Sequence, residues 1–224
     1  MRYGLTIFAH YTWSHTLDVS TDSNGGGAPM NPYNWRLDYG NSNWDIRHRF
    51  VASFVYDIPF FHVSNPVLNA VFTNWQTNGI WTLQTGIPFN VSVSSDTANT
   101  ASNGTYRPNL VGKPTSNCGD GHLVNCISTS AFAPIPPGVY EYGSAGRNLL
   151  HGPPLFSMNL SFFKNFPIQE RLKLQFRTEM FNAFNEVNFA NPNAVFGTAA
   201  FGTIGSLNPN VPNRVIQFAG KLLF

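Results

Sequence analysis

Apolar and polar residues alternate with a period of two along six stretches of the chain. The clearest stretch is RLKLQFRTEMF, in which Leu172, Leu174 and Phe176 alternate with charged and amide side chains. This period is that of a β-strand with two unlike faces. We predict strands at 5–16, 47–57, 74–93, 156–166, 171–184 and 214–224, and we expect the third to bend near Gly86 and Pro88.

The connections between these strands alternate in length. Those at 18–44, 94–155 and 185–212 are long, that at 58–73 is shorter, and that at 167–170 is a tight turn, PIQE. Long structureless loops are uncommon in compact soluble domains. Outer-membrane barrels, however, join their strands by short periplasmic turns and longer extracellular loops. The pattern therefore predicts an all-β fold, an antiparallel transmembrane β-barrel segment of about six strands in a meander, with the tight turn in the periplasm.

The composition and the strand faces agree with a membrane barrel. Charged residues make up 11% of the chain and aromatic residues 15%, whereas about a quarter of a typical soluble domain is charged. The aromatic content argues against disorder, the net charge of +2 is too weak to suggest nucleic acid, and no apolar run is long enough for a transmembrane helix. One face of the strands carries polar side chains that suit a wet lumen, namely Arg49, Asp57, Gln175, Arg177 and Glu179.

Six strands are too few for a complete barrel, because bacterial single-chain barrels begin at eight. The opening, MRYGLTIFAHYTW, does not have the pattern of a signal peptide. We therefore expect residues 1–224 to be a fragment of a larger barrel, with Met1 an internal residue or a downstream start. The alternative is a secreted soluble β-sandwich, such as a carbohydrate-binding module; the low charge and the loop lengths favour the barrel over it.

Several segments, taken in order, resemble one family. They are WDIRHRFVASFVYDIP (44–59), NWQTNGIWTLQTGIPF (74–89), GSAGRNLLHGP (143–153), LQFRTEMFNAFNEVNF (174–189), AFGTI (200–204) and the last strand. Together they resemble the C-terminal end of a TonB-dependent transporter barrel of the Oar-like kind, which carries a carboxypeptidase-regulatory-like domain. The resemblance implies an outer-membrane location of the Gram-negative type, a 22-stranded barrel closed by a plug domain, and uptake of siderophore complexes, cobalamin or glycans. The plug and the TonB contact belong to the family's N-terminal region, which we expect to be absent here.

The last strand also resembles the signal that the barrel assembly machinery recognises. That signal combines a polar residue, a glycine and apolar or aromatic residues at the last and third-last positions. Gln217, Gly220, Leu222 and Phe224 match it in this chain. The resemblance therefore implies the assembly machinery, outer-membrane lipid, the plug and the remaining strands as partners.

The candidate chemistry is sparse. Cys118 and Cys126 lie close together without a nearby histidine pair, which favours a local disulfide over a zinc site. No hydrolase, metalloprotease or nucleotide-binding motif is present, so we expect no catalytic activity and no metal or other cofactor. His48 suits a structural or lumen position better than a metal site.

Two pairs of polar residues each admit two interpretations. Arg177 and Glu179 share one strand face and either contact a plug or substrate or form cross-strand ion pairs, which we favour. Arg147 and Asn148 either bind a ligand or, as we favour, hold a loop by hydrogen bonds to carbonyl groups.

Overall fold

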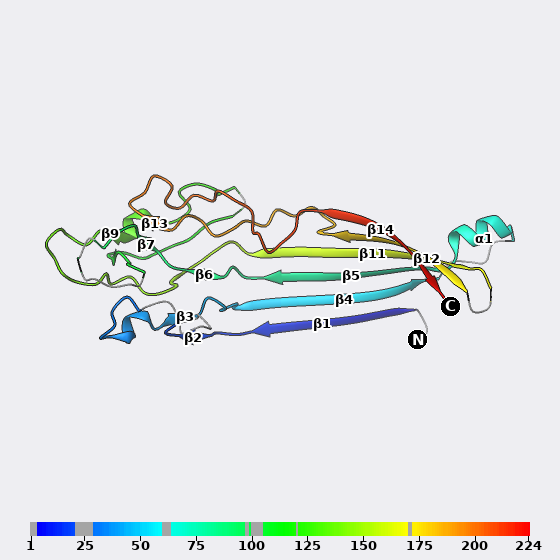
Figure 1. Ribbon diagram of the computed structural model, residues 1–224, viewed down its shortest axis with the longest axis horizontal. Helices are drawn as coiled ribbons and strands as arrows, with labels where there is room; N and C mark the ends of the chain where they lie inside the picture. Colours follow the sequence, from blue (N-terminus) through cyan, green and yellow to red (C-terminus); the bar gives the residue numbers. More distant parts are fainter. Residues whose placement is uncertain are drawn as a thin grey trace.

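A single antiparallel sheet of six long strands dominates the computed structural model, which describes residues 4–20, 29–59, 64–96, 99, 105–119, 121–169 and 172–224. The strands are β1 (Leu5–Trp13), β4 (His48–Ile58), β5 (Trp75–Gln84), β11 (Leu155–Pro167), β12 (Lys173–Phe181) and β14 (Val215–Leu223). Each pairs with the next long strand along the chain, and Figure 1 shows them side by side. The predicted six-stranded meander is confirmed, and the described sheet is open rather than closed into a barrel.

The third predicted strand is shorter than expected. It ends at Gln84, and residues 88–93 instead supply two short strands, β6 (Pro88–Phe89) and β7 (Ser92–Val93), to other pairings. The chain turns away at Gly86, where an added Cβ would lie 1.8 Å from the carbonyl oxygen of Gly152. Pro88 has no amide hydrogen to continue a ladder. The expected bend is therefore present, but the continuous strand over 74–93 was wrong.

The pairing register separates the sheet into two unlike faces, because residues paired across antiparallel strands point to the same side. What we call the apolar face carries the alternate residues from Leu5 to Trp13, His48 to Ile58, Trp75 to Leu83, Phe156 to Phe166, Leu174 to Met180 and Ile216 to Leu222. What we call the polar face carries the alternate residues from Thr6 to Thr12, Arg49 to Asp57, Gln76 to Gln84, Leu155 to Pro167, Lys173 to Phe181 and Val215 to Leu223.

Long and short connections leave opposite ends of the sheet. At the turn end, β11 and β12 are joined by a short connection in which the amide of Leu172 donates to the carbonyl oxygen of Gln169 at 3.2 Å. The connection between β4 and β5 at the same end contains the short helix α1 (Pro66–Phe72). Asn65 caps α1 by accepting hydrogen bonds from the amides of Val67 and Leu68. At the loop end lie the three long connections, 14–47, 85–154 and 182–214 (Figure 1). The alternation read from the sequence is thus present, and no described helix has the length and apolarity to cross a membrane.

The long connections are not irregular loops, as their polar composition had indicated, but pack together into a loop assembly. Short strands pair within it: β2 (Leu17–Asp18) with β3 (Gly40–Asn41), β6 with β10 (Leu150–His151), β8 (Asn109–Leu110) with β9 (Phe132–Ala133), and β7 with β13 (Val195–Phe196). Two short 3-10 helices, η1 (Trp35–Asp38) and η2 (Thr129–Ala131), complete it.

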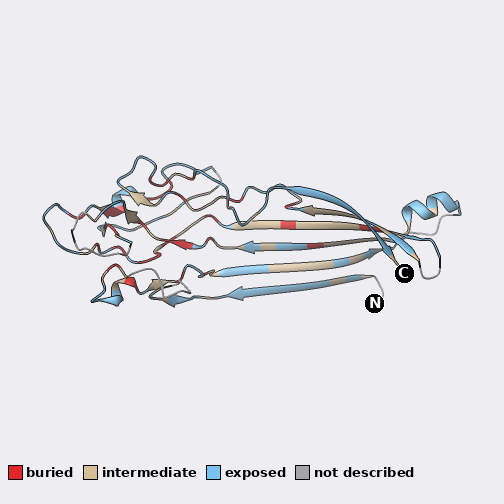
Figure 2. Cartoon of the chain, in the orientation of Figure 1, coloured by how far each residue is buried: buried red, intermediate tan, exposed pale blue. Residues whose placement is uncertain are grey.

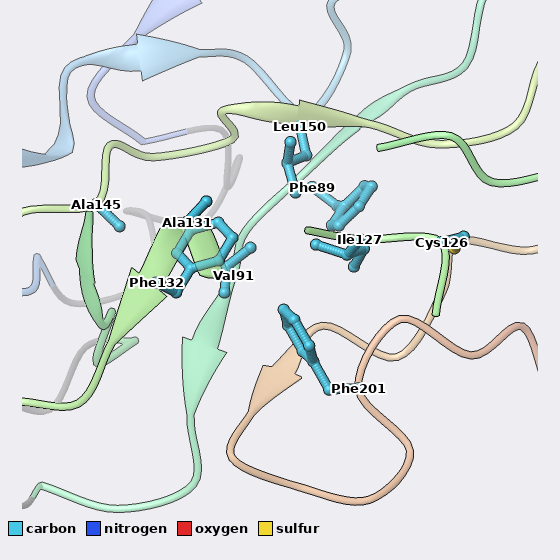
Figure 3. Close-up of a cluster of buried hydrophobic side chains, with 9 residues drawn as sticks. All are labelled: Phe89, Val91, Cys126, Ile127, Ala131, Phe132, Ala145, Leu150 and Phe201. Atoms are coloured by element: carbon cyan, nitrogen blue, oxygen red, sulfur yellow. The ribbon is translucent and has the colours of Figure 1, made fainter. Parts of the chain in front are cut away.

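The main cluster of buried apolar side chains lies in this loop assembly and not on the sheet. It contains Phe89, Val91, Cys126, Ile127, Ala131, Phe132, Ala145, Leu150 and Phe201, drawn in Figure 3. Figure 2 shows the same division, with most buried positions in the connections and the long strands largely half-buried or exposed. The sheet therefore obtains little of its stability from side-chain packing within this chain.

Gly79 is a close contact point on the apolar face. It pairs with Phe54 of β4 and Leu160 of β11, and an added Cβ would lie 2.6 Å from the Phe54 ring and 2.9 Å from a Leu160 methyl. Overpacking of this kind costs about 1–3 kcal/mol. We expect Gly79→Ala to lower the melting temperature of the folded protein, measured by heat-modifiable gel mobility.

The matched control is Gly220→Ala, because Gly220 lies on the same face and an added Cβ there meets nothing within 4 Å. Equal melting temperatures for the two variants would show that the close packing around Gly79 is not as described.

Candidate functional site

The five polar residues expected to line a lumen all lie on the polar face. Arg49 is near the loop end of β4 and Asp57 near its turn end, whereas Gln175, Arg177 and Glu179 follow one another at alternate positions of β12. The structure thus brings the β12 residues together and leaves Arg49 and Asp57 on β4, which β5 and β11 separate from β12.

Amide side chains link neighbouring strands across the polar face. Gln76 donates to Asp57 at 2.7 Å, Gln217 donates to Glu179 at 2.6 Å, and Gln175 donates to Asn165 at 2.9 Å. Each bond joins residues that face each other in the register. Charged residues here are therefore held by neutral partners, which tie the strands together in their register.

The cross-strand ion pairs that we favoured for Arg177 and Glu179 are not present among the described residues. Arg177 is instead held by a neighbour on its own strand and by a ring. Its Nε donates to the side-chain oxygen of Gln175 at 2.7 Å, and its guanidinium lies 4.9 Å from the centre of the Phe163 ring. Phe163 is the only buried residue among the polar-face positions that the structure describes. The polar face is thus open rather than packed, as expected for a wall that faces water or a separate domain.

The apolar face, in contrast, exposes large side chains over its whole length. Ile7 is 62% exposed on β1 and Phe218 is 68% exposed on β14, with exposed aromatic and aliphatic residues on the strands between. Tyr11 and Trp13 lie at the loop end, and Trp75 lies at the turn end. A nine-residue strand such as β1 is about 30 Å long, which covers about 23 Å at a tilt of about 40° and so fits the ~25 Å apolar band of a membrane barrel.

Lys164 is the one lysine or arginine among the described positions of the apolar face, and its environment explains why it is tolerated. The side chain is 2% exposed and lies 5.7 Å from the Trp75 ring and 5.2 Å from the Phe166 ring. Its ammonium group donates to the carbonyl oxygen of Thr73, outside the strands at the turn end. The charge is thus carried out of the apolar band, as long basic side chains do near membrane boundaries.

A family model described as an outer membrane beta barrel domain matches residues 1–217. The chain belongs to this family. A search of the curated proteins and a search of the solved structures returned no match. The predicted barrel fold and outer-membrane location are confirmed. In outer-membrane barrels the apolar outer face of the strands is the one that meets lipid.

The loop assembly of the barrel segment is held together by a buried ion pair that sequence reasoning missed. Arg107 is 2% exposed, and its Nη1 donates to Oδ1 of Asp38 at 2.7 Å. Its other guanidinium nitrogens donate to the carbonyl oxygens of Ala145 and Leu37 at 2.9 and 2.7 Å. Oδ2 of Asp38 accepts from the amide of Met30. The pair joins connection 14–47 to connection 85–154, and no local pattern around either residue indicates this pairing.

Arg147 and Asn148 hold the same two connections, by the kind of contact that we favoured. Arg147 donates to both the carbonyl oxygen and the carboxylate of Asp18. Asn148 is 1% exposed and adopts φ = 49°. Its side-chain amide donates to the backbone carbonyl oxygen of Asn41 at 2.7 Å, and the side-chain amide of Asn41 donates to the backbone carbonyl oxygen of Asn148 at 2.9 Å. An asparagine tolerates this left-handed conformation better than most residues.

Asp45 and His151 form a further buried contact at the base of the loops. Asp45 is fully buried, which raises the pKa of its carboxyl, but hydrogen bonds from Arg47 and the amide of Thr16 outweigh burial and lower that pKa overall. Burial lowers the pKa of His151, whose Nε2 lies 3.8 Å from Asp45, with the charge of Arg47 adding to the effect.

The remaining predicted residues are placed as follows. Cys118 and Cys126 are joined by a disulfide within connection 85–154. His48 lies on the apolar face at the loop end, where its Nδ1 is 2.7 Å from the Tyr11 hydroxyl. Among the residues described, no three or more His, Cys, Asp or Glu side chains gather in a way that would hold a metal ion. At the C-terminus, Gly220 and Leu222 lie on the apolar face and Phe224, beyond the end of β14, is 97% exposed.

We expect Arg107→Met to loosen the loop assembly, because it leaves the Asp38 carboxylate buried without its cation. Breaking a buried pair in this way costs about 3–5 kcal/mol. Limited proteolysis of the protein in outer-membrane vesicles should cut connections 14–47 and 85–154 faster than in the wild type. Arg36→Met, at an exposed arginine of η1, is the control and should be cut at the wild-type rate. Equal cleavage of the two variants would contradict the role given to Arg107.

Proposed function

We propose that this chain forms part of the barrel wall of a TonB-dependent transporter for bulky nutrients of the siderophore, cobalamin or glycan class. The open polar face is the observation that carries the proposal. A barrel of about eight strands fills its interior with side chains, whereas the polar face here buries Phe163 alone among its described positions. Such a face suits a wide lumen that holds water or a plug domain.

The two edge strands of the sheet are a second argument for a larger barrel. Within the described residues β1 pairs only with β4, and β14 pairs only with β12. An unpaired backbone group in the hydrocarbon core costs several kcal/mol, so both edges need partner strands in the membrane. The proposal supplies these from the remaining strands of a parent transporter, whose N-terminal region provides the plug and the contact with TonB.

The terminal strand supports the proposed route of assembly. Gly220 and Leu222 lie on the lipid-facing side of β14, an edge strand of the described sheet. The barrel assembly machinery would then engage an edge that offers unpaired backbone groups. A β-sandwich, the alternative, would place a second sheet over the apolar face, and the described residues provide none.

The test uses the complete gene in its own host. A strain that lacks the gene should fail to take up one bulky nutrient, supplied in turn as ferric siderophore, cobalamin or oligosaccharide at limiting concentration. A strain that lacks TonB should show the same loss, and uptake of small solutes should be unchanged in both. Reintroducing the gene should restore uptake.

Two results would contradict the proposal. The first is energised uptake of all three nutrient classes at the parental rate in the strain without the gene. The second is passive permeability to small solutes that depends on the gene, which would indicate a porin-like channel.

A further inference from the structure

A cavity of about 450 Å³ lies on the apolar face at the loop end of the sheet. Its floor is one cross-strand row, in which Tyr11, Phe50, Leu83 and Phe156 pair in turn across β1, β4, β5 and β11. The row belongs to the face that meets lipid, and two of its members, Tyr11 and Leu83, are 64% and 41% exposed. The cavity is therefore continuous with the lipid-facing surface.

Two loop segments rise over this floor as walls. One contains Pro153 and Pro154, immediately before β11, and the other is residues 186–189, which include Val187 and Phe189. The second wall is fixed to the loop end of β11 by Asn188, which is 6% exposed. Its side chain accepts from the amide of Phe156 at 2.9 Å and donates to the carbonyl oxygen of the same residue at 2.8 Å.

A further pair of bonds continues this attachment along β11. The amide of Ala183 donates to the carbonyl oxygen of Met158 at 2.7 Å, and the amide of Asn182 donates to the side chain of Asn159 at 3.0 Å. The wall is thus bonded to the strand over several residues, so the cavity is preformed rather than opened by its occupant.

The chemistry of the lining favours an acyl chain over a charged headgroup. Most of the lining is aromatic, aliphatic or proline, and its ionisable side chains are Tyr11, His48 and Glu186, with no lysine or arginine among the residues that line it. A phosphate group would need such cations. The Tyr11 hydroxyl is already bonded to His48 and marks the polar rim at the level of Trp13.

We propose that this cavity binds an acyl chain of a lipid in the outer leaflet. The loop assembly then extends over the membrane surface and holds one lipid against β1, β4, β5 and β11. The inference rests on the lipid exposure of the apolar face and not on the transport proposed above, so each can fail without the other. The bound lipid would couple residues 186–189 to the membrane surface.

The test is photo-crosslinking of the full-length protein in vesicles of phosphatidylethanolamine and phosphatidylglycerol. The probe is a phosphatidylethanolamine with a diazirine at the end of one acyl chain. Peptides containing Leu83, Pro153 or Val187 should carry several-fold more crosslinked lipid than the peptide of β14 that contains Ile216, which is 49% exposed on the same face but outside the cavity.

Three variants distinguish lipid binding in the cavity from general lipid contact along the apolar face. Leu83→Trp and Val187→Trp fill the space from the floor and from the wall, and each should reduce crosslinking at the cavity several-fold. Ile216→Trp, the control, should leave it unchanged, and heat-modifiable gel mobility verifies that each variant is folded. Uniform crosslinking along the apolar face, or cavity crosslinking that folded Leu83→Trp and Val187→Trp both leave intact, would overturn the proposal.

Discussion

The pairing register of the six long strands is the constraint on which the rest of the structure depends. A slip by one residue would exchange the two faces of a strand, so that Arg177 and Glu179 would lie on the apolar face and Phe176 on the polar face. The register is reinforced on both sides. On the polar face Gln217 bonds to Glu179, and on the apolar face Phe54 and Leu160 close over Gly79. Backbone hydrogen bonds, which lipid cannot replace, make this pairing obligatory.

The chain divides its stabilising interactions between two environments. The sheet buries few side chains within the chain and leaves its apolar face exposed, whereas the loop assembly has its own apolar cluster, a disulfide and the buried Arg107–Asp38 pair. Because these loops have a core, they present a fixed surface at the loop end of the sheet. The same rigidity forms the walls of the cavity at the membrane boundary, because residues 186–189 are bonded to β11 by Asn188.

Sequence alone predicted the long strands, whose residues alternate in a regular pattern. The period of two gave the six strands, their faces and the alternation of connections, because each depends on local pattern. It did not give the loop assembly: Arg107 meets Asp38 across 69 residues, and Asn148 meets Asn41 across 107. It also extended the third strand over 85–93, where the polar alternation continues but the backbone of Gly152 approaches Gly86. Such long-range contacts leave no periodic trace in the sequence.

We infer that one face of the sheet meets lipid and that the other meets the lumen. Spin labels on single cysteines at positions 175 to 179 of β12 test it directly in reconstituted membranes, since Cys118 and Cys126 are already bonded to each other. We expect labels at Gln175, Arg177 and Glu179 to be reached by a water-soluble paramagnetic nickel complex, and labels at Phe176 and Thr178 to be reached by oxygen dissolved in lipid. The same accessibility at all five positions, or alternation in the opposite phase, would contradict it.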